Sequence, residues 1–261
     1  MRIPLPVILF ALWCFVIGVG AHVCEDIAGQ IDIFAVNELP STAHLLGTDA
    51  LGRDMLAALF VGARTSLAIG LAAAVISLVS GTAIGMVSAY YGGWFDTCLM
   101  RLLDTMRAVP TLLLLLFWQA MTEPSYLSVI VILGAVGWLY TARIIRSETH
   151  IHAASEHVLA ARMMGIGGLT IIRRHILPYC TGRIRILFLL ELSGAMTMEA
   201  AISFLGMGLP PYMPSPGTML SHAMSGVLLG YWWQAFLPGA VLVITLILVH
   251  GCVVTMKKEA Q

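Results

Sequence analysis

Charged side chains are scarce in this chain: they make up 11% of its 261 residues, whereas 59% of the residues are hydrophobic. The mean hydropathy is +0.91. This composition excludes an ordinary soluble domain, in which about a quarter of the residues are charged. Several apolar runs exceed the ~20 residues that a helix needs to cross a bilayer. They lack the alternation of a membrane β-barrel, so the sequence predicts an all-α polytopic membrane protein.

Lysine is rarer still, because Lys257 and Lys258 are the only two in the chain. Neither follows a glycine-rich loop, and a phosphate-binding loop requires Gly-Lys-Ser/Thr, so the chain has no such ATP site of its own. The sequence also lacks a G-x-S-x-G elbow and an H-E-x-x-H pair. We therefore expect a non-catalytic protein with no cofactor in this chain. No basic patch with interleaved aromatics indicates a nucleic-acid partner.

The cysteines show no spacing that indicates a zinc motif or a disulfide framework, and we interpret them as small apolar fillers. They are Cys14, Cys24, Cys98, Cys180 and Cys252. Three histidines do cluster, His150, His152 and His157, but the residues around them match no zinc-ligand motif. We interpret them as solvated loop residues and predict no metal site.

Six apolar runs predict six membrane helices. They cover Ile3–Ala21, Ser66–Tyr90, a third segment that ends near Met121, Ser125–Ile145, Ile184–Leu205 and Trp233–Met256. The first run is long and has no small-x-small cleavage site, so we interpret it as a membrane helix and not as a signal peptide. We divide the chain into 1–65, the first helix with the polar segment after it, and 66–256, a core of five helices.

The basic residues fall almost entirely on one side of these six spans. With the N-terminus inside, twelve of the fourteen would be cytoplasmic, and only Arg53 and Arg64 would lie outside. The twelve are Arg2, Arg101, Arg107, Arg143, Arg146, Arg162, Arg173, Arg174, Arg183, Arg185, Lys257 and Lys258. Because basic residues concentrate in cytoplasmic loops, the pattern predicts that both termini are cytoplasmic.

The polar segment 148–178 is the longest interruption in the apolar C-terminal half. Within it, Ser155 can cap a short helix over 156–164 that ends before Gly165. Ala161 and Gly165 fall one turn apart on a small-residue face, beside a pair of larger apolar residues. These larger residues are Leu159 and Met163. The pattern is typical of a helix that lies in another protein's groove, and it is equally compatible with a surface loop.

This segment resembles the cytoplasmic coupling loop of the inner-membrane permeases of bacterial ABC importers, whose motif reads E-A-A, three residues, G, nine residues, I-x-L-P. Leu159 and His175 replace the Glu and the Ile of that motif. The variants V-x-A-A-R-x-x-G and R-H-x-L-P are usual in one branch, the dipeptide, oligopeptide and nickel permeases. The resemblance implies that the docking site for an ATPase comprises Leu159, Ala160, Ala161, Arg162, Gly165, Leu177 and Pro178.

Three further blocks resemble the same branch, so that the resemblance extends over 39–220. The first, H-x-L-G-T-D-x-x-G-R-D, ends at Asp54 and indicates either a solvated loop with an Asx-type turn at 48–51 or a small periplasmic lid. The second, G-Y-x-G-G-W-x-D with M-R-x-x-D, contains a helical triplet that we interpret as an anchor at the cytoplasmic end of the third helix. The triplet is Arg101, Asp104 and Arg107. The third starts at Glu199 and leads into a loop in which Pro216 replaces the usual Trp.

The resemblance implies a type I ABC importer permease fold and identifies the chain as the C-type member of a permease pair in the bacterial inner membrane. It implies a second permease subunit, two cytoplasmic ATPases that bind ATP and magnesium, and a periplasmic solute-binding protein as partners within the membrane lipid. The transported solute would be a peptide or nickel, the metal free or chelated.

Other readings of the sequence remain open. An ATP-independent secondary transporter or channel subunit is the main alternative, although no internal repeat or midplane charge relay points to one. Exporters rarely carry the loop motif. The outer histidines His22, His44 and His222 have no spacing that predicts a metal path.

Two carboxylates, Glu191 and Glu199, fall in the fifth predicted span. An ionisable group at the centre of a membrane helix costs about 2.5–3.5 kcal/mol on insertion scales, so it usually faces the bundle interior or a water-filled path. We consider both as residues of the translocation path. The alternative for Glu199, at the outer end of the helix, is a structural hydrogen bond to the outer loop.

Overall fold

The computed structural model describes residues 4–259, and within this range it contains helices and no strand. Five segments are long and apolar enough to cross a membrane. They comprise α1 (Leu5–Ala28), α2 (Met55–Tyr91), α5 (Tyr126–Ala153), the stretch that ends in α8 (Leu177–Phe204), and α10 (Trp233–Glu259). The shorter helices are α3 (Gly93–Ala108), α4 (Thr111–Ala120), α6 (Glu156–Met163), α7 (Gly168–Ile171), the π-helical η1 (Ile172–Ile176) and α9 (Pro216–Leu228).

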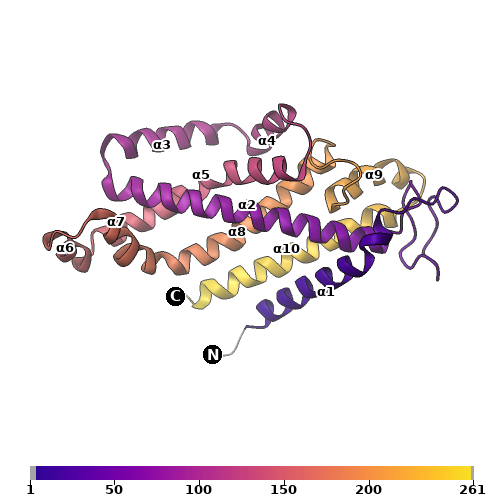
Figure 1. Cartoon of the computed structure of the whole chain (residues 1–261), viewed down its shortest axis with the longest axis horizontal. Coiled ribbons are helices and arrows are strands. Elements are labelled where there is room, and N and C mark those ends of the chain that lie inside the picture. The colour runs from indigo at the N-terminus through magenta and orange to yellow at the C-terminus, as the bar shows by residue number, and fades with distance from the viewer. Residues whose placement is uncertain (1–3, 260–261) are drawn as a thin grey trace.

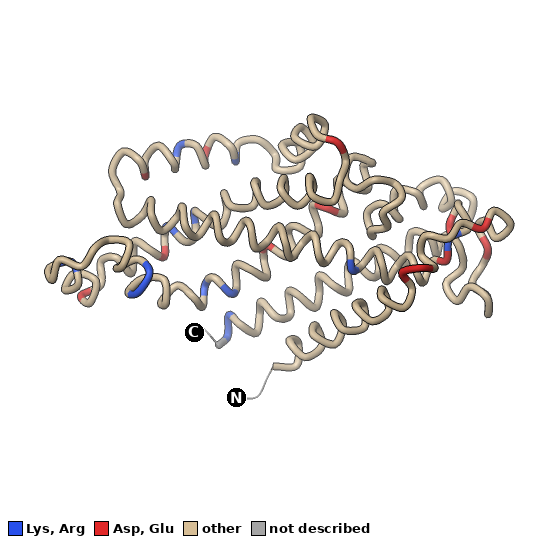
Figure 2. Tube along the Cα trace, in the orientation of Figure 1, with Lys and Arg blue, Asp and Glu red and all other residues tan. Residues whose placement is uncertain are grey.

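The helices form an elongated bundle with α6 at one end and α9 at the other (Figure 1). Both chain termini lie toward the α6 end, and the loop between α1 and α2 lies at the α9 end. Figure 2 shows acidic residues gathered around that loop, whereas basic residues predominate toward the α6 end. The bundle therefore has chemically different ends.

The third predicted membrane helix is divided in two. Val109 is extended, with φ −89° and ψ 132°, and Pro110 precedes α4. Because the proline ring disfavours a helical residue before it and removes a backbone donor, the helix stops here. α3 and α4 together connect the α6 end to the start of α5 (Figure 1). The all-α six-pass architecture is confirmed, but the prediction of one continuous third helix is wrong.

Polar turns extend several helices beyond the apolar runs that predicted them. α2 begins at Met55 and not at Ser66, because Asp54 caps it and accepts a hydrogen bond from the Ala57 N–H at 2.9 Å. At the α6 end, α5 continues beyond Ile145 and α8 begins before Ile184. Hydropathy marks the membrane-buried part of a helix, whereas the caps mark its ends.

The predicted loop that follows the fifth span and contains Pro216 is helical in its second half, where α9 begins. Ser215 Oγ accepts from the Thr218 N–H at 3.2 Å, and Thr218 Oγ1 accepts from the Ser215 N–H at 2.8 Å. This reciprocal capping box starts the helix, and Pro216 occupies its first turn, where a missing N–H costs nothing. Pro216 is therefore compatible with this segment.

Small residues set α2 close to α5. A Cβ on Gly85 would lie 2.6 Å from the Ala142 carbonyl oxygen, and one on Gly81 would lie 2.7 Å from Thr141 Cβ. Such approach is possible only without side chains, which is how small residues serve helix association in membranes. α2 also contacts α1 and α8, so it is the central helix of the bundle.

Candidate functional site

The short helix α6 forms within one residue of its predicted bounds. Gly165 ends it with a φ of +75°, in the left-handed region that favours glycine. The Ile166 N–H donates to the Ala161 carbonyl at 3.2 Å and the Gly165 N–H to the Arg162 carbonyl at 3.0 Å, which is a Schellman motif. Ser155 stands at the N-cap, but its hydroxyl donates to the His152 carbonyl instead of capping α6.

One face of α6 packs onto the rest of the chain. Val158 and Ala161 are buried, Ala161 with only 1% of its surface exposed, in an apolar cluster with Met86, Ile171 and Ile176. The prediction that Ala161 belongs to a docking face therefore needs correction. Its small side chain lets α6 lie against α5, α7 and η1, and a partner protein has no access to it in this structure.

The opposite face of α6 is exposed and apolar. Leu159 and Met163 are exposed, the latter at 89%, and so is Met164 immediately after the helix. Ala160, Arg162, Gly165 and Pro178 are also exposed, whereas Leu177 is partly buried. A side chain added at Gly165 would meet nothing within 4 Å. We call Leu159, Ala160, Met163, Met164 and Gly165 the α6 ridge. Met164 is an addition that the family motif did not indicate.

Aromatic contacts join α6 and α7 to the end of α2. The Arg162 guanidinium lies over the Tyr90 ring, 4.4 Å from its centroid, an arrangement attractive to a cation. Gly168 lies so close to this end of α2 that a Cβ on it would be 2.8 Å from Tyr90 Cε1 and from the Tyr91 hydroxyl. The helix that carries the α6 ridge is therefore in contact with the end of the central helix α2.

A partly buried ion pair fixes the start of α3. Arg146 of α5 donates to Asp96 through Nε at 2.6 Å and Nη2 at 2.5 Å, and Ser88 of α2 donates to Asp96 Oδ1 at 2.5 Å. Asp96 lies outside the five spanning segments. The hydrogen bonds from Arg146 lower the pKa of its carboxyl to about 2. The anchor is thus Asp96, which the sequence interpretation missed.

The triplet that was predicted as an anchor has different roles. Asp104 forms an ion pair with Arg143 of α5, and Arg101 is exposed. Arg107 is fourteen residues from the start of α3, which corresponds to about 21 Å at 1.5 Å per residue. It lies well away from the α6 end, so its placement as an end anchor is wrong.

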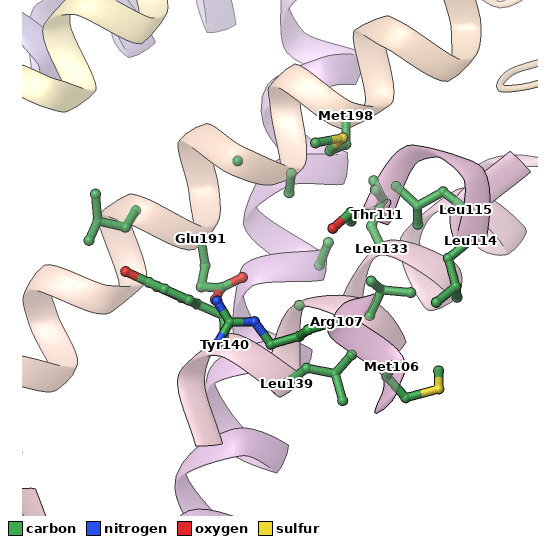
Figure 3. Close-up of a pocket in the computed structure, with 16 residues that line it drawn as sticks. Met106, Arg107, Thr111, Leu114, Leu115, Leu133, Leu139, Tyr140, Glu191 and Met198 are labelled. Atoms are coloured by element: carbon green, nitrogen blue, oxygen red, sulfur yellow. The ribbon is translucent and has the colours of Figure 1, made fainter. Parts of the chain in front are cut away.

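A cavity of about 300 Å³ lies between the α3–α4 segment, α5 and α8. Its two charged lining residues are Arg107 and Glu191, and most of the others are apolar (Figure 3). Thr141 donates to Glu191 Oε1 at 2.9 Å. A Cβ on Gly137 would lie 2.6 Å from Glu191 Oε2 and 2.7 Å from Ser77 Oγ, so a glycine makes room for the carboxylate. Glu191 therefore has the surroundings of a path residue.

Glu199 has different surroundings. It is fully buried and accepts hydrogen bonds from Ser66 at 2.6 Å and from Ser203 at 2.8 Å. It does not line the cavity that Glu191 lines. The geometry favours a structural role that joins α8 to α2, so the assignment of Glu199 to the path is not supported.

The histidine-containing block before α2 forms a compact turn at the α9 end. Asp49 Oδ1 accepts from the Leu51 and Arg53 N–H groups at 2.8 and 2.9 Å, which is the predicted Asx-type turn. His44 Nδ1 lies 2.9 Å from Asp54 Oδ2. Gln234 of α10 donates to the Thr48 carbonyl at 3.1 Å. No group of three or more His, Cys, Asp or Glu side chains placed to hold a metal occurs within the described range.

Known proteins share both the fold and the sequence pattern. A chain of the MetNI methionine ABC transporter, solved in inward-facing conformations, is 20% identical with a TM-score of 0.62, and the match covers 79% of this chain and 98% of that chain. This likeness shows the fold alone.

Curated relatives are closer in sequence. The dipeptide transport system permease protein DppC of Bacillus subtilis (strain 168) is 34% identical over 79% of this chain and 65% of its own length. The oligopeptide transport system permease protein OppC of the same organism is 36% identical over 79% and 68%. The glutathione transport system permease protein GsiD of Pectobacterium atrosepticum is 34% identical over 78% and 68%. The matched region spans about two thirds of the length of these relatives.

The comparisons confirm the resemblance that the loop motifs indicated. Residues 81–256 match the family described as binding-protein-dependent transport system inner membrane component. With this match and the identities to its relatives, the chain belongs to that family.

Proposed function

We propose that this chain is a permease subunit of an ATP-driven importer that carries peptides across the bacterial inner membrane. The family match over residues 81–256 carries the permease role. The relatives named for dipeptide, oligopeptide and glutathione transport favour a peptide over nickel as the solute. ATP and magnesium would be bound by partner ATPases, because this chain has no phosphate-binding loop.

The α6 ridge is the proposed docking surface for one of two ATPases. Exposed apolar side chains at the end of a membrane bundle suit a groove in a soluble partner. Leu177 and Pro178, at the start of α8, belong to this surface in the proposal. The buried Val158 and Ala161 hold α6 against the bundle. A displacement of the ridge would therefore reach α2 and α8 as a rigid-body movement.

In this arrangement the α6 end and both termini are cytoplasmic. The concentration of basic residues toward that end supports this orientation (Figure 2). A periplasmic binding protein would then deliver the solute at the α9 end, and a second permease subunit would complete the membrane part. Glu191 is the residue of the translocation path in this proposal.

The test is peptide uptake by proteoliposomes that contain the chain with its partner permease and ATPases, loaded by the binding protein. We expect uptake of a labelled dipeptide that requires ATP and stops when ATP is replaced by a non-hydrolysable analogue. Uptake driven by an ion gradient without ATP would establish the secondary transporter instead. Uptake of nickel without peptide would overturn the choice of solute.

A further inference from the structure

Two opposite charges face one cavity deep inside the bundle. Glu191 is fourteen residues from the start of α8, as Arg107 is from the start of α3, so each lies about 21 Å along its helix. Glu191 also lies seven residues, about 10 Å, beyond Ile184, where the apolar run of its helix begins, and so within a hydrocarbon core about 30 Å thick. Their side chains extend toward each other from the two helices (Figure 3).

Neither charge is neutralised by an ion pair among the described residues. This distinguishes them from Asp96 and Asp104, which pair with Arg146 and Arg143. Both residues line the cavity, Arg107 as an exposed side chain and Glu191 as a half-buried one. Because an unpaired charge at this depth is costly, such residues usually serve a substrate or ion pathway.

The carboxylate of Glu191 is held in position and remains available to bind a cation. The Thr141 hydroxyl fixes one oxygen at 2.9 Å, and the other occupies the gap that Gly137 leaves beside the buried Ser77. Arg107 presents the planar guanidinium that pairs with carboxylates through two parallel hydrogen bonds. The site therefore offers one receptor for a cation and one for a carboxylate.

We propose that Arg107 and Glu191 form a transit site for the two charged ends of a short peptide. Glu191 receives the terminal ammonium group and Arg107 receives the terminal carboxylate. The inference rests on the proposed function, since it takes peptides as the solute. A volume of about 300 Å³ is at the lower limit of ligand pockets, about 300–1,000 Å³, which suits a di- or tripeptide.

The rest of the lining fits a site that accepts many side chains. Met106 and Met198 lie on opposite helices of the cavity, and methionine adapts its shape to different neighbours. Leu114, Leu115 and Leu133 add apolar surface without further charge. The backbone termini would be recognised by charge, and the variable side chains only by loose apolar contact.

Gly194 provides a reporter position for this site. It lines the cavity, and a side chain there would meet nothing within 4 Å. In the assembled transporter in proteoliposomes, on a Cys98→Ser background, Gly194→Cys is labelled with a methanethiosulfonate reagent with and without dialanine. We expect dialanine to slow the labelling at least five-fold. The control is Gly18→Cys on α1, also with open space, whose labelling rate should not change.

Two variants that each remove one charge test whether the protection of Gly194→Cys by dialanine depends on Arg107 and Glu191. Glu191→Gln or Arg107→Gln should abolish protection of Gly194→Cys by dialanine, measured in each variant as the ratio of the labelling rates with and without the peptide. Dialanine whose termini are blocked by acetylation and amidation should give no protection of Gly194→Cys when Arg107 and Glu191 are both present. Dialanine uptake should fall about ten-fold in each variant.

The outcomes separate this site from the function on which it rests. Protection that persists in both glutamine variants, or equal protection by the blocked peptide, would overturn the transit site. Dialanine uptake without any protection in the wild-type cavity would overturn it as well and leave the proposed function intact. Failure of the wild-type vesicles to take up any peptide would overturn the proposed function itself.

Discussion

The guanidinium of Arg162 lies over the ring of Tyr90, 4.4 Å from its centroid. This contact joins the exposed helix α6 to the last turn of α2, the helix at the centre of the bundle. The proposed function requires that a movement of α6 reaches the membrane helices. The contact between Arg162 and Tyr90 is one connection, and the buried face of α6 is the other. The two connections can be tested separately.

Removal of the Arg162 contact should weaken coupling more than assembly. A cation over an aromatic ring contributes about 0.5–1 kcal/mol at an exposed site, so Arg162→Ala should leave the fold intact. We expect ATP hydrolysis by the complex to continue while dipeptide uptake per ATP falls several-fold. Arg173→Ala is the matched control, because Arg173 is also an exposed arginine, in η1. An unchanged ratio of uptake to hydrolysis in Arg162→Ala would contradict this role.

Neighbouring alanines on α6 should respond oppositely to the same enlargement. Ala161→Trp overfills a buried position, which costs about 1–3 kcal/mol, so the thermal midpoint should fall by several degrees. Ala160→Trp points outward and should leave the midpoint unchanged, but it should prevent co-purification with the ATPase. The measurement is a thermal unfolding scan beside a pull-down. Retained ATPase binding by Ala160→Trp would remove the α6 ridge from the docking surface.

Asp96→Asn should lower stability at neutral pH, because it leaves Arg146 without its carboxylate. Breaking a buried ion pair by removing one partner costs about 3–5 kcal/mol when the pair is fully buried, so we expect a smaller loss at this partly buried site. The folded pKa, about 2, lies below the ordinary value of 3.8. The stabilisation is therefore present above pH 3.8 and is lost as the pH falls toward 2.

The pH dependence of that difference is measurable in detergent-solubilised protein. The gap in unfolding midpoint between wild type and Asp96→Asn should be constant from pH 7 to about 5 and should narrow below about 4. Asp104→Asn, at an exposed pair, should produce a much smaller gap at neutral pH. Equal gaps for the two variants would show that Asp96 is not the anchor of α3.

Glu199 should behave as a structural residue and Glu191 as a path residue. Glu199→Ala leaves the buried Ser66 hydroxyl without its acceptor, and an unsatisfied buried group costs about 1–3 kcal/mol. We expect a lower unfolding midpoint and unchanged preference between free and blocked dipeptides. Glu191→Ala should alter that preference with a small change in the midpoint. A changed preference in Glu199→Ala at normal protein level would return Glu199 to the path.

Much of this arrangement could be predicted where a local signal sets it. Gly165 marks the end of α6 because only a left-handed residue closes the helix there. The Val109–Pro110 break and the Ser215–Thr218 capping box are also local signals. Neither feature was predicted, because Val109 and Pro110 interrupt a long apolar run, and the four prolines over 210–216 are typical of a loop.

The remaining features depend on tertiary packing. Whether Ala161 or Ala160 faces the bundle is decided by Met86 and Ile176, which lie in other segments of the chain. Likewise Arg107 and Glu191 come together from two helices far apart in sequence, and no spacing rule relates them. Hydropathy counts treat both residues as isolated charges, so neither their cavity nor their orientation could be read from the chain alone.

The interruption at Val109–Pro110 provides a hinge between α3 and α4, the two parts of the third membrane segment. The segment α3 carries Arg107 and is held near its start by the ion pair between Asp96 and Arg146. The segment α4 lacks this ion pair and contributes Leu114 and Leu115 to another part of the cavity wall. Because two separate helices line this side of the cavity, one of them can move while the other stays in place. We therefore expect α3 and α4 to move as separate units, with a hinge at Val109 and Pro110, so that the cavity widens on one side at a time.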